Sequence, residues 1–341
     1  MCSHLKTATV AAMVLMTFCA PIRAQGDDAQ VAAHVNAAKT AAGKDFEGVF
    51  SRVCTEARAP AAPAAAAPPA RPSGPPERST WYAAPVKVFD NLYFVGQSEY
   101  SAWAVTTSDG IIIVDTIFDY SVKAEVADGL TKLGLDPQQI KYAIVSHGHG
   151  DHSGGAKYLQ DTFGARIVLS ADDWDLLERS NGTKPKRDIV ATDGMKLTLG
   201  DTTLTLYVTP GHTLGTLSTV IPVKDNGRSH VAVEWGCTAF NWMNNNGRGY
   251  ITAERPATFW FENYIKSSAR FRDIAKRSGA DVLIANHTIF DGSKTKLPAM
   301  ATRKPGDPHP YVIGADGVQR YMTVVNECAQ AGLARVASRA P

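Results

Sequence analysis

Residues 144–155 read Ile-Val-Ser-His-Gly-His-Gly-Asp-His-Ser-Gly-Gly, and they place three imidazoles and a carboxylate at His147, His149, Asp151 and His152. In an ordinary core each of these groups would need its own polar partner. Zinc, by contrast, takes neutral imidazole nitrogen and carboxylate oxygen as its usual ligands. The glycines between them allow the tight backbone path that aims several side chains at one point. The stretch therefore predicts a metal site, and the alternative is a polar loop with incidental histidines.

The amino-terminal residues 1–24 have the layout of a secretory signal peptide. Lys6 precedes a mostly apolar stretch, which ends at Arg23-Ala24 before a polar sequence. This stretch is too short, and becomes polar too abruptly, for a membrane span. We expect export to the periplasm and cleavage. An uncleaved anchor is the alternative, because Ile22 is an imperfect small residue before the cut.

The charge balance argues against two classes of partner. Removal of residues 1–24 takes Lys6 and Arg23 away and leaves 33 basic and 33 acidic residues. A formal charge of about zero gives no indication of a nucleic acid or an anionic membrane as the partner.

The remaining chain divides into three segments. Residues 25–58 form an amino-terminal segment with a short helix expected around Val31–Ala42, and we assign it no chemistry. Residues 59–79 are a linker, since Ala59–Pro76 is almost wholly Ala and Pro and behaves as an extended tether. Residues 80–341 are the expected folded domain.

Three cysteines remain after the expected cleavage, Cys54, Cys237 and Cys328. In an oxidising periplasm two of the three can pair. A Cys54–Cys328 bond would tie the amino-terminal segment onto the domain, and the alternative is that all three thiols are free.

From Trp81 onward, short β-branched runs alternate with helical patterns, which predicts an α/β fold whose sheets are covered by helices. The expected strands are Leu92–Gly96, Ala102–Thr107, Ile111–Asp115, Tyr142–Ser146, Arg166–Leu169, Leu204–Thr209, Ser218–Ile221, His230–Glu234 and Val282–Ala285. The expected helices are Val122–Leu133, Gly155–Phe163, Ala171–Arg179 and Ala257–Ser278. We expect Ser170 to cap the third helix together with Asp173.

Each candidate metal residue lies just beyond one of these apolar strands. His147 follows the strand at 142–145, His212 follows the strand at 204–208 and a turn, and His287 follows the strand at 282–285. Strand ends hold loop residues rigidly at one rim of a sheet. We therefore expect the cluster and the two distant histidines to converge.

Three motifs resemble the metal motifs of the metallo-β-lactamase superfamily: residues 147–155, Thr209-Pro210-Gly211-His212-Thr213 and Asn286-His287. The similarity runs from about Val88 to Gly332, and the spacing of the motifs fits as well. The resemblance implies an α/β (α+β) fold, the four-layer αβ/βα sandwich with two sheets inside and helices outside. It also implies two Zn²⁺ per chain, the first held by His147, His149 and His212, the second by Asp151, His152 and His287.

This ligand set implies hydrolysis of an acyl bond. Three imidazoles leave one position of a tetrahedral zinc open for water, and a hydroxide shared by two zincs would attack the substrate carbonyl. Asp151 is the expected catalytic residue, because it would orient this water as well as bind metal. A protein that only binds or stores metal is the alternative from another class, and the open position argues against it.

The residues of the strand between the last two histidines indicate which branch of the superfamily the chain resembles. Glyoxalase II-like and lactonase-like hydrolases often carry a bridging Asp there in a Gly-Asp pair, and residues 230–241 hold no such pair. Glu234 is either a substitute for this aspartate or a strand residue with some other partner, and we favour the second. The missing carboxylate, together with His152 after Asp151, resembles the subclass B3 metallo-β-lactamases. We expect a β-lactam as the small-molecule substrate, hence antibiotic resistance, with a lactonase or thioesterase as the alternative.

Two further residues remain open from the sequence. Cys237 is either a thiolate ligand of zinc or a small buried hydrophobe, and we favour the second because His152 completes the second ligand set. Asp115 is either an acceptor for a ligand histidine or an ordinary strand-end aspartate. The histidines outside the motifs are interpreted as surface or structural residues: His4, His34, His230 and His309.

Overall fold

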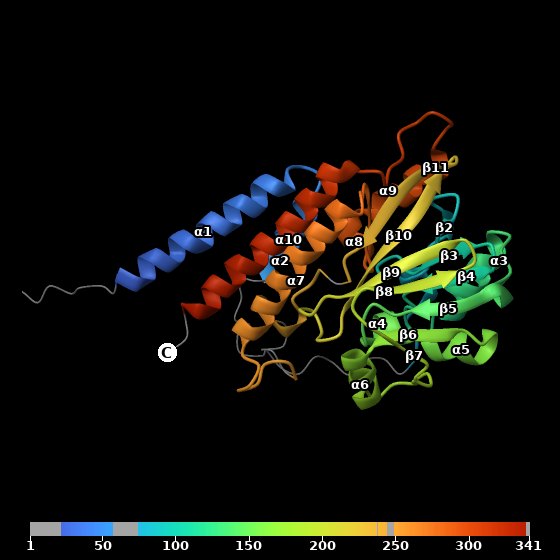
Figure 1. Ribbon diagram of the computed structural model, residues 1–341, viewed down its shortest axis with the longest axis horizontal. Coiled ribbons are helices and arrows are strands. Elements are labelled where there is room, and N and C mark those ends of the chain that lie inside the picture. Colours follow the sequence, from blue (N-terminus) through green and yellow to red (C-terminus); the bar gives the residue numbers. More distant parts are fainter. Residues whose placement is uncertain (1–21, 57–73, 237, 244–248, 339–341) are drawn as a thin grey trace, which may run out of the picture.

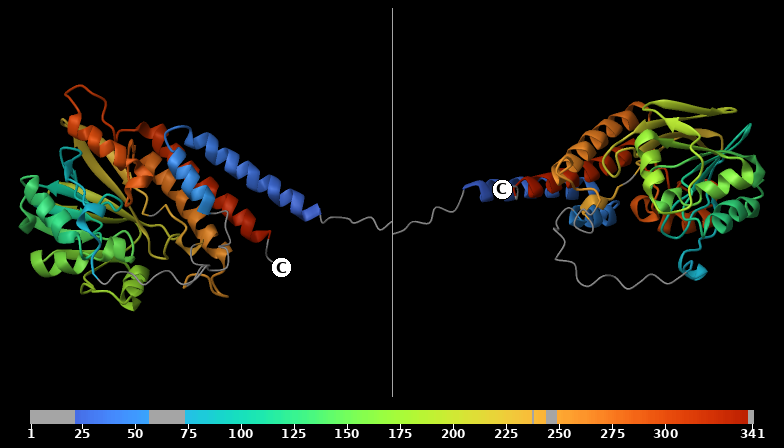
Figure 2. Two further views of the ribbon diagram at one scale, coloured as in Figure 1. Left: turned by 180° about the vertical axis from the view of Figure 1, so that it is seen from behind. Right: turned by 90° about the horizontal axis from the view of Figure 1, so that it is seen from below.

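The computed structural model describes residues 22–56, 74–236, 238–243 and 249–338. Two β-sheets lie face to face inside the molecule, and helices cover both outer faces (Figure 1). Helix α1 (Ile22–Ala42) extends away from the sheets beside the carboxyl-terminal helix, as both views of Figure 2 also show.

The first sheet has seven strands, which follow one another in chain order. They are β1 (Val86–Lys87), β2 (Leu92–Phe94), β3 (Trp103–Thr107), β4 (Gly110–Val114), β5 (Ile140–Ile144), β6 (Arg166–Ser170) and β7 (Ile189–Ala191). Pairing is antiparallel from β1 to β4 and parallel from β4 to β7.

The second sheet has five strands in the order β12-β11-β10-β9-β8. They are β8 (Met195–Leu199), β9 (Thr202–Val208), β10 (Leu217–Asp225), β11 (Arg228–Glu234) and β12 (Val282–Ile284). In this sheet only β11 and β12 pair in parallel. The chain between them includes a long helix, and the carboxyl ends of both strands therefore lie at the same rim of the sheet.

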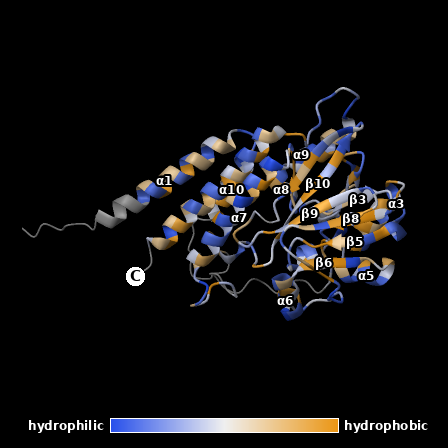
Figure 3. Ribbon diagram, viewed as in Figure 1, coloured by the Kyte–Doolittle hydropathy of each residue, from blue (hydrophilic) through white to orange (hydrophobic). Residues whose placement is uncertain are grey.

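Three hydrophobic clusters separate four layers. On β4, Ile112 and Val114 belong to the cluster between the sheets, whereas Ile111 and Ile113 belong to the cluster on the outer face of the first sheet. This alternation follows the period of two along a strand. A third cluster lies between the second sheet and its helices. The predicted αβ/βα sandwich is confirmed, and Figure 3 shows the apolar residues concentrated along its strands.

The first sheet is covered by α3 (Asp128–Lys132), α5 (Ala156–Phe163) and α6 (Ala171–Arg179), and the second by α7 (Ala257–Arg277) and α10 (Gly314–Ala337). Shorter elements are α4 (Gly150–Ser153), α8 (Thr288–Asp291), α9 (Ser293–Thr302), the 3₁₀ turns η1 (Arg78–Thr80) and η3 (Pro137–Gln139), and the π-helical turn η2 (Lys123–Ala127). The helix expected at 122–133 is therefore a π-helical turn followed by the short helix α3.

The prediction that Ser170 and Asp173 cap α6 is wrong. Ser170 occupies the N-cap position but makes no capping hydrogen bond, and its buried hydroxyl has no partner among the described residues. The Asp173 carboxylate instead accepts hydrogen bonds from two loops outside the helix. These tertiary contacts replace the local capping interaction.

The amino-terminal helices α1 and α2 (Glu47–Glu56) pack on α10 and contribute to the third cluster. Their attachment includes a Cys54–Cys328 disulfide, with Cα atoms 4.8 Å apart. The pairing that the sequence left open is therefore present. Arg320 of α10 also forms an ion pair with Asp45.

Residues 1–21 and 57–73 lie outside the described residues, so the signal peptide, the linker and the domain boundaries stay predictions. Among the helices that the structure describes, none combines the length and apolarity that a bilayer crossing requires.

Candidate metal centre

The six sequence-predicted residues reach one point from three strand ends. The loop after β5 carries His147 and His149 and continues into α4, which holds Asp151 and His152. The turn after β9 carries His212, and His287 follows β12 directly before α8. The convergence expected from the strand pattern is what the fold produces.

The nitrogen and oxygen atoms of these residues lie at ligand-to-ligand distances. His149 Nδ1 is 3.0 Å from His212 Nε2, and His152 Nε2 is 3.1 Å from His287 Nε2. Asp151 Oδ2 lies 3.3 Å from His152 Nε2 and 3.7 Å from His287 Nε2. Two ligands held tetrahedrally at zinc–nitrogen distance lie roughly 3.3 Å apart. The spacing therefore fits a metal centre.

The donor atoms form two overlapping groups, each with all of its atoms within 4.8 Å of one another: His147, His149 and His212, and His147, Asp151 and His152. His147 Nε2 is buried and has no hydrogen-bond partner among the described residues. A buried imidazole nitrogen without a partner is costly unless something binds it. The residues present therefore fit a metal ion.

Hydrogen bonds from the outside fix which nitrogen of each imidazole faces inward. His152 Nδ1 donates to Asp115 Oδ2 at 2.7 Å, and His212 Nδ1 donates to the Ala239 carbonyl at 2.8 Å. His149 Nε2 contacts the Tyr250 hydroxyl, which leaves Nδ1 toward the centre. Such partners orient metal ligands and raise their basicity.

Burial holds most of these imidazoles in the neutral form that binds metal. It lowers the pKa of His149 to about 4 and that of His287 to about 3. Burial likewise lowers the pKa of His147 and of His212 well below the ordinary value. All four side chains are therefore neutral at pH 7 and ready to donate a lone pair.

His152 differs from the other four because two carboxylates face it. Burial lowers its pKa, but the charges and hydrogen bonds of Asp151 and Asp115 together outweigh this effect and raise the pKa to about 10. For Asp151, burial raises the pKa, and the adjacent His152 lowers it well below the ordinary value. Metal binding at this side must therefore release a proton from His152.

Asp115 is the acceptor that the sequence left open. Its two oxygens accept hydrogen bonds from the Ser146 amide at 2.6 Å and the Ser146 hydroxyl at 2.9 Å, in addition to His152. Its backbone has φ 61°, a conformation that Asp and Asn adopt more readily than other non-glycine residues. Asp115 therefore joins the end of β4 to the start of the metal cluster.

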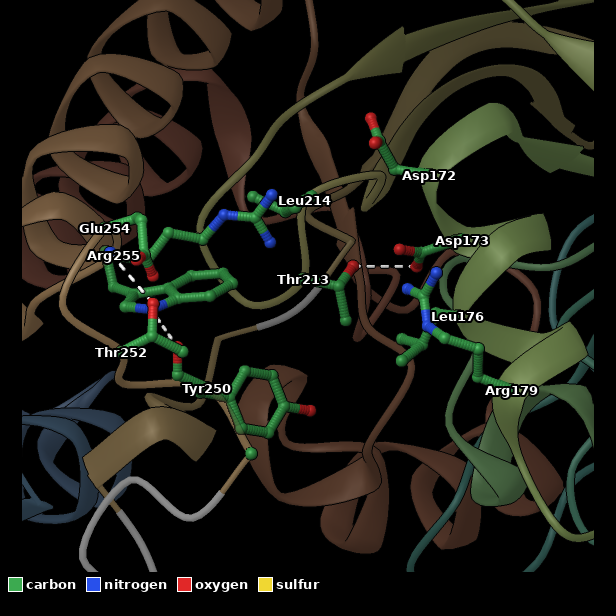
Figure 4. Close-up of a pocket in the computed structure, with 12 residues that line it drawn as sticks. Asp172, Asp173, Leu176, Arg179, Thr213, Leu214, Tyr250, Thr252, Glu254 and Arg255 are labelled. Carbon is green, nitrogen blue, oxygen red and sulfur yellow. Dashed lines mark hydrogen bonds between the residues drawn. The ribbon is translucent and has the colours of Figure 1, made fainter.

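A cavity of about 350 Å³ lies beside the centre (Figure 4). One wall is formed by α6 with Asp172, Leu176 and Arg179, and the opposite wall by Tyr250, Thr252, Glu254 and Arg255. Trp260 also lines the cavity. Thr213, next to His212, lies between the two walls. A small-molecule substrate bound here would lie next to the metal ligands.

Three residues that contact the ligands or their loops were not predicted from the sequence. Asn241 Nδ2 lies 3.2 Å from His212 Nε2, Tyr250 contacts His149, and Asp173 binds the ligand loops. Asn241 and Tyr250 lie between β11 and α7, where the sequence does not specify how the chain folds back, and Asp173 lies on α6, where its position indicated a helix cap.

Other residues considered from the sequence lie elsewhere. His230 pairs with Asp281 at 2.6 Å, His309 Nε2 donates to the Val88 carbonyl at 2.7 Å, and His34 pairs with Glu327 at 2.7 Å. Glu234 is fully buried, and neither carboxyl oxygen has a partner among the described residues, contrary to expectation. His4 and Cys237 lie outside the described residues.

Comparisons with known proteins agree with this geometry. Residues 95–225 match the family described as the metallo-beta-lactamase superfamily. The chain belongs to this superfamily. It has the metallo-β-lactamase fold and a histidine cluster that fits a metal ion.

Its solved structural neighbours include BJP-1, a subclass B3 metallo-β-lactamase of Bradyrhizobium japonicum. That structure is 28% identical, with a TM-score of 0.61, and the match covers 72% of this chain and 91% of the neighbour.

The curated relatives have other names. The N-acyl homoserine lactonase AttM of Rhizobium johnstonii is 25% identical over 50% of this chain and 67% of its own length. A hydroxyacylglutathione hydrolase of Acidiphilium cryptum is 29% identical over 33% of this chain and 41% of its own. The chain thus spans between 28% and 67% of the first curated relatives that it matches.

Proposed function

We propose that this protein is an exported di-zinc hydrolase that opens the amide bond of β-lactam rings. The observation that carries the proposal is the placement of Asp151, His152 and His287 in mutual contact on one side of the centre. Two imidazoles and one carboxylate provide a second metal with a ligand set that needs no bridging aspartate from the strand before α7. The likeness to BJP-1 supports the same branch.

Two zinc ions bound here would supply an acidified water as nucleophile and a Lewis acid for the substrate carbonyl. The chain itself holds the reacting groups in place. His147, His149 and His212 form one set of ligands, and Asp151, His152 and His287 form the other. Asp151 also orients the attacking water, since its carboxylate is partly accessible while His152 is fully enclosed.

A lactonase or a thioesterase is the second candidate, and the names of the curated relatives favour it. The metallohydrolase chemistry would be the same, with an ester or thioester carbonyl in place of the lactam. The ligand set supports the β-lactam, because the intervening strand β11 carries Glu234 and no aspartate for a bridging position.

Export is part of the proposal. Residues 1–24 have the signal-peptide layout, and the Cys54–Cys328 disulfide is of a kind that persists in oxidising compartments. We propose the periplasm as the place where the protein meets its substrate.

The decisive experiment is a hydrolysis panel on one zinc-loaded sample whose metal content is measured. Nitrocefin, a carbapenem, an N-acyl homoserine lactone and a hydroxyacylglutathione thioester would be compared. We expect β-lactam turnover that a chelator abolishes and zinc restores. Turnover of the lactone or thioester with intact β-lactams would refute the proposed substrate.

A pair of histidine variants controls for the fold. His152→Ala is expected to lose activity and half of the bound zinc, whereas His230→Ala, whose imidazole pairs with Asp281 away from the centre, keeps both.

A further inference from the structure

Asp173 is a buried residue whose carboxylate accepts hydrogen bonds from two loops of the metal centre. No side-chain hydrogen bond caps the N-terminus of its own helix. It lies on α6 and is only 1% exposed. Its Oδ2 accepts from the Gly148 amide at 3.0 Å and from the Thr213 hydroxyl at 2.7 Å, and its Oδ1 accepts from the Gly215 amide at 3.1 Å. One side chain thus bridges two loops far apart in the sequence.

These loops carry the first ligand set. Gly148 lies between His147 and His149, and Thr213 directly follows His212. Because His149 Nδ1 and His212 Nε2 are only 3.0 Å apart, a small change in loop separation changes the ligand geometry directly. Metal and catalytic sites tolerate displacements of only about 0.5 Å.

The space around two glycines of these loops independently shows how closely the loops approach α6. A Cβ atom at Gly215 would lie 2.0 Å from Ser170 Oγ and 2.8 Å from the Asp173 amide nitrogen. A Cβ atom at Gly148 would lie 3.0 Å from the Asp173 carbonyl oxygen. Both loops therefore approach α6 at the point where Asp173 binds them, and at position 215 the contact requires glycine.

The same helix forms a wall of the cavity beside the centre. Asp172, Leu176 and Arg179 of α6 line it, and Figure 4 shows the Asp173–Thr213 hydrogen bond between this wall and the centre. A shift of α6 would thus move the wall and the ligand loops together.

We propose that Asp173 is a positioning residue that sets the separation of the His147–His149 loop and the His212 loop and joins both to the cavity wall. The inference rests on the proposed metal site but not on the proposed substrate. An asparagine cannot replace the carboxylate, because its NH₂ group would face a donor on one side or the other.

The test compares Asp173→Asn with Asp172→Asn in the full chain. Asp172 is the exposed neighbour, lines the same cavity and loses the same charge. Zinc affinity is measured by competition with a chromophoric chelator, and ligand geometry by the visible spectrum of the cobalt-loaded protein. We expect Asp173→Asn to bind zinc about 10–100-fold more weakly, with an altered cobalt spectrum, and Asp172→Asn to stay within about twofold of the parent.

The thermal shift separates positioning from general stability. A positioning role reduces the gain in melting temperature that zinc gives, whereas a merely structural role lowers the apo and zinc-loaded values equally. Unchanged zinc affinity and cobalt spectrum in Asp173→Asn would overturn the inference, even if stability falls.

If Asp173→Asn does not fold, Thr213→Val removes one of the three hydrogen bonds that Asp173 accepts, together with the hydrogen bond between the Thr213 and Thr216 hydroxyls. We then expect several-fold weaker zinc binding, and unchanged binding would overturn the inference. Because metal binding is the readout, failure of the β-lactam proposal leaves this test intact.

Discussion

Asp115 Oδ2 accepts a hydrogen bond from His152 Nδ1 at 2.7 Å, and neither side chain has any exposure to solvent. The carboxylate fixes the imidazole so that its other nitrogen faces His287 and Asp151. Asp115 itself is held by both the amide and the hydroxyl of Ser146. The orientation of His152 therefore depends on the end of a neighbouring strand, β4.

Replacement Asp115→Asn is expected to weaken metal binding. Asparagine tolerates the positive φ of this position, so the backbone is preserved, but one of the three accepted hydrogen bonds must be lost. We expect zinc affinity to fall about 10–100-fold, as for other residues that orient a ligand histidine. Chelator competition measures it. An affinity within twofold of the parent would show that His152 needs no such support.

Two arginines and three carboxylates (Asp172, Asp173 and Glu254) line the cavity, so we expect Arg255 to make only a small contribution to the binding of an anionic substrate. Arg179 and Arg255 lie on opposite walls, both exposed (Figure 4). Exposed charge pairs contribute about 0.2–1 kcal/mol, so Arg255→Gln should raise KM for a carboxylate-bearing substrate by up to about fivefold with little change in kcat. Steady-state kinetics at low and high salt measure this. Lys294→Gln, at a different cavity, is the matched control, and equal effects in both variants would contradict the assignment.

The disulfide is expected to contribute strongly to stability. It joins residues 274 positions apart, and loss of a native disulfide commonly costs about 2–5 kcal/mol. The double variant Cys54→Ser, Cys328→Ser should therefore unfold at lower denaturant concentration. A reductant should shift the parent chain to the same midpoint and leave the variant unchanged. A parent chain insensitive to the reductant would contradict this expectation.

Glu125 predicts a pH dependence of stability away from the metal centre. Burial raises the pKa of its carboxyl to about 8, although the Ala83 amide donates to it. The folded-state pKa thus exceeds the unfolded value of about 4.3, so stability is full below the unfolded pKa and is lost as pH rises through 8. Glu125→Gln should match the parent most closely near pH 5 and exceed it in melting temperature at pH 9. A constant difference across this range would argue against the shift.

The sequence pattern predicted most of the fold because its signals are local. The strands from β2 to β6 and from β9 to β12 contain apolar, largely β-branched runs, and their predicted positions overlap the observed ones. The prediction omitted β1 and β7, which have only two and three residues, and β8, whose exposed lysine and threonine interrupt the apolar run. It also omitted α10, in which three glycines weaken the helical signal.

The metal residues were accessible from sequence because each follows a strand that fixes its position. Asp173, Asn241 and Tyr250 were not, since their contacts with the centre join residues 25, 29 and 101 positions apart. Such contacts depend on how loops close over the rim, and no local period encodes that. Asp173 had a plausible local role as part of a helix cap, and the tertiary contacts displaced it.

The bond between Cys54 and Cys328 closes the chain from residue 54 to residue 328 into a covalent ring. A protease that cut once within the Ala- and Pro-rich residues 59–76 would produce two polypeptides that stay linked. The nicked protein would migrate as one species on a non-reducing gel and separate only after reduction. In an environment rich in proteases, the helices α1 and α2 would thus remain attached to the folded domain after the connecting segment had been severed.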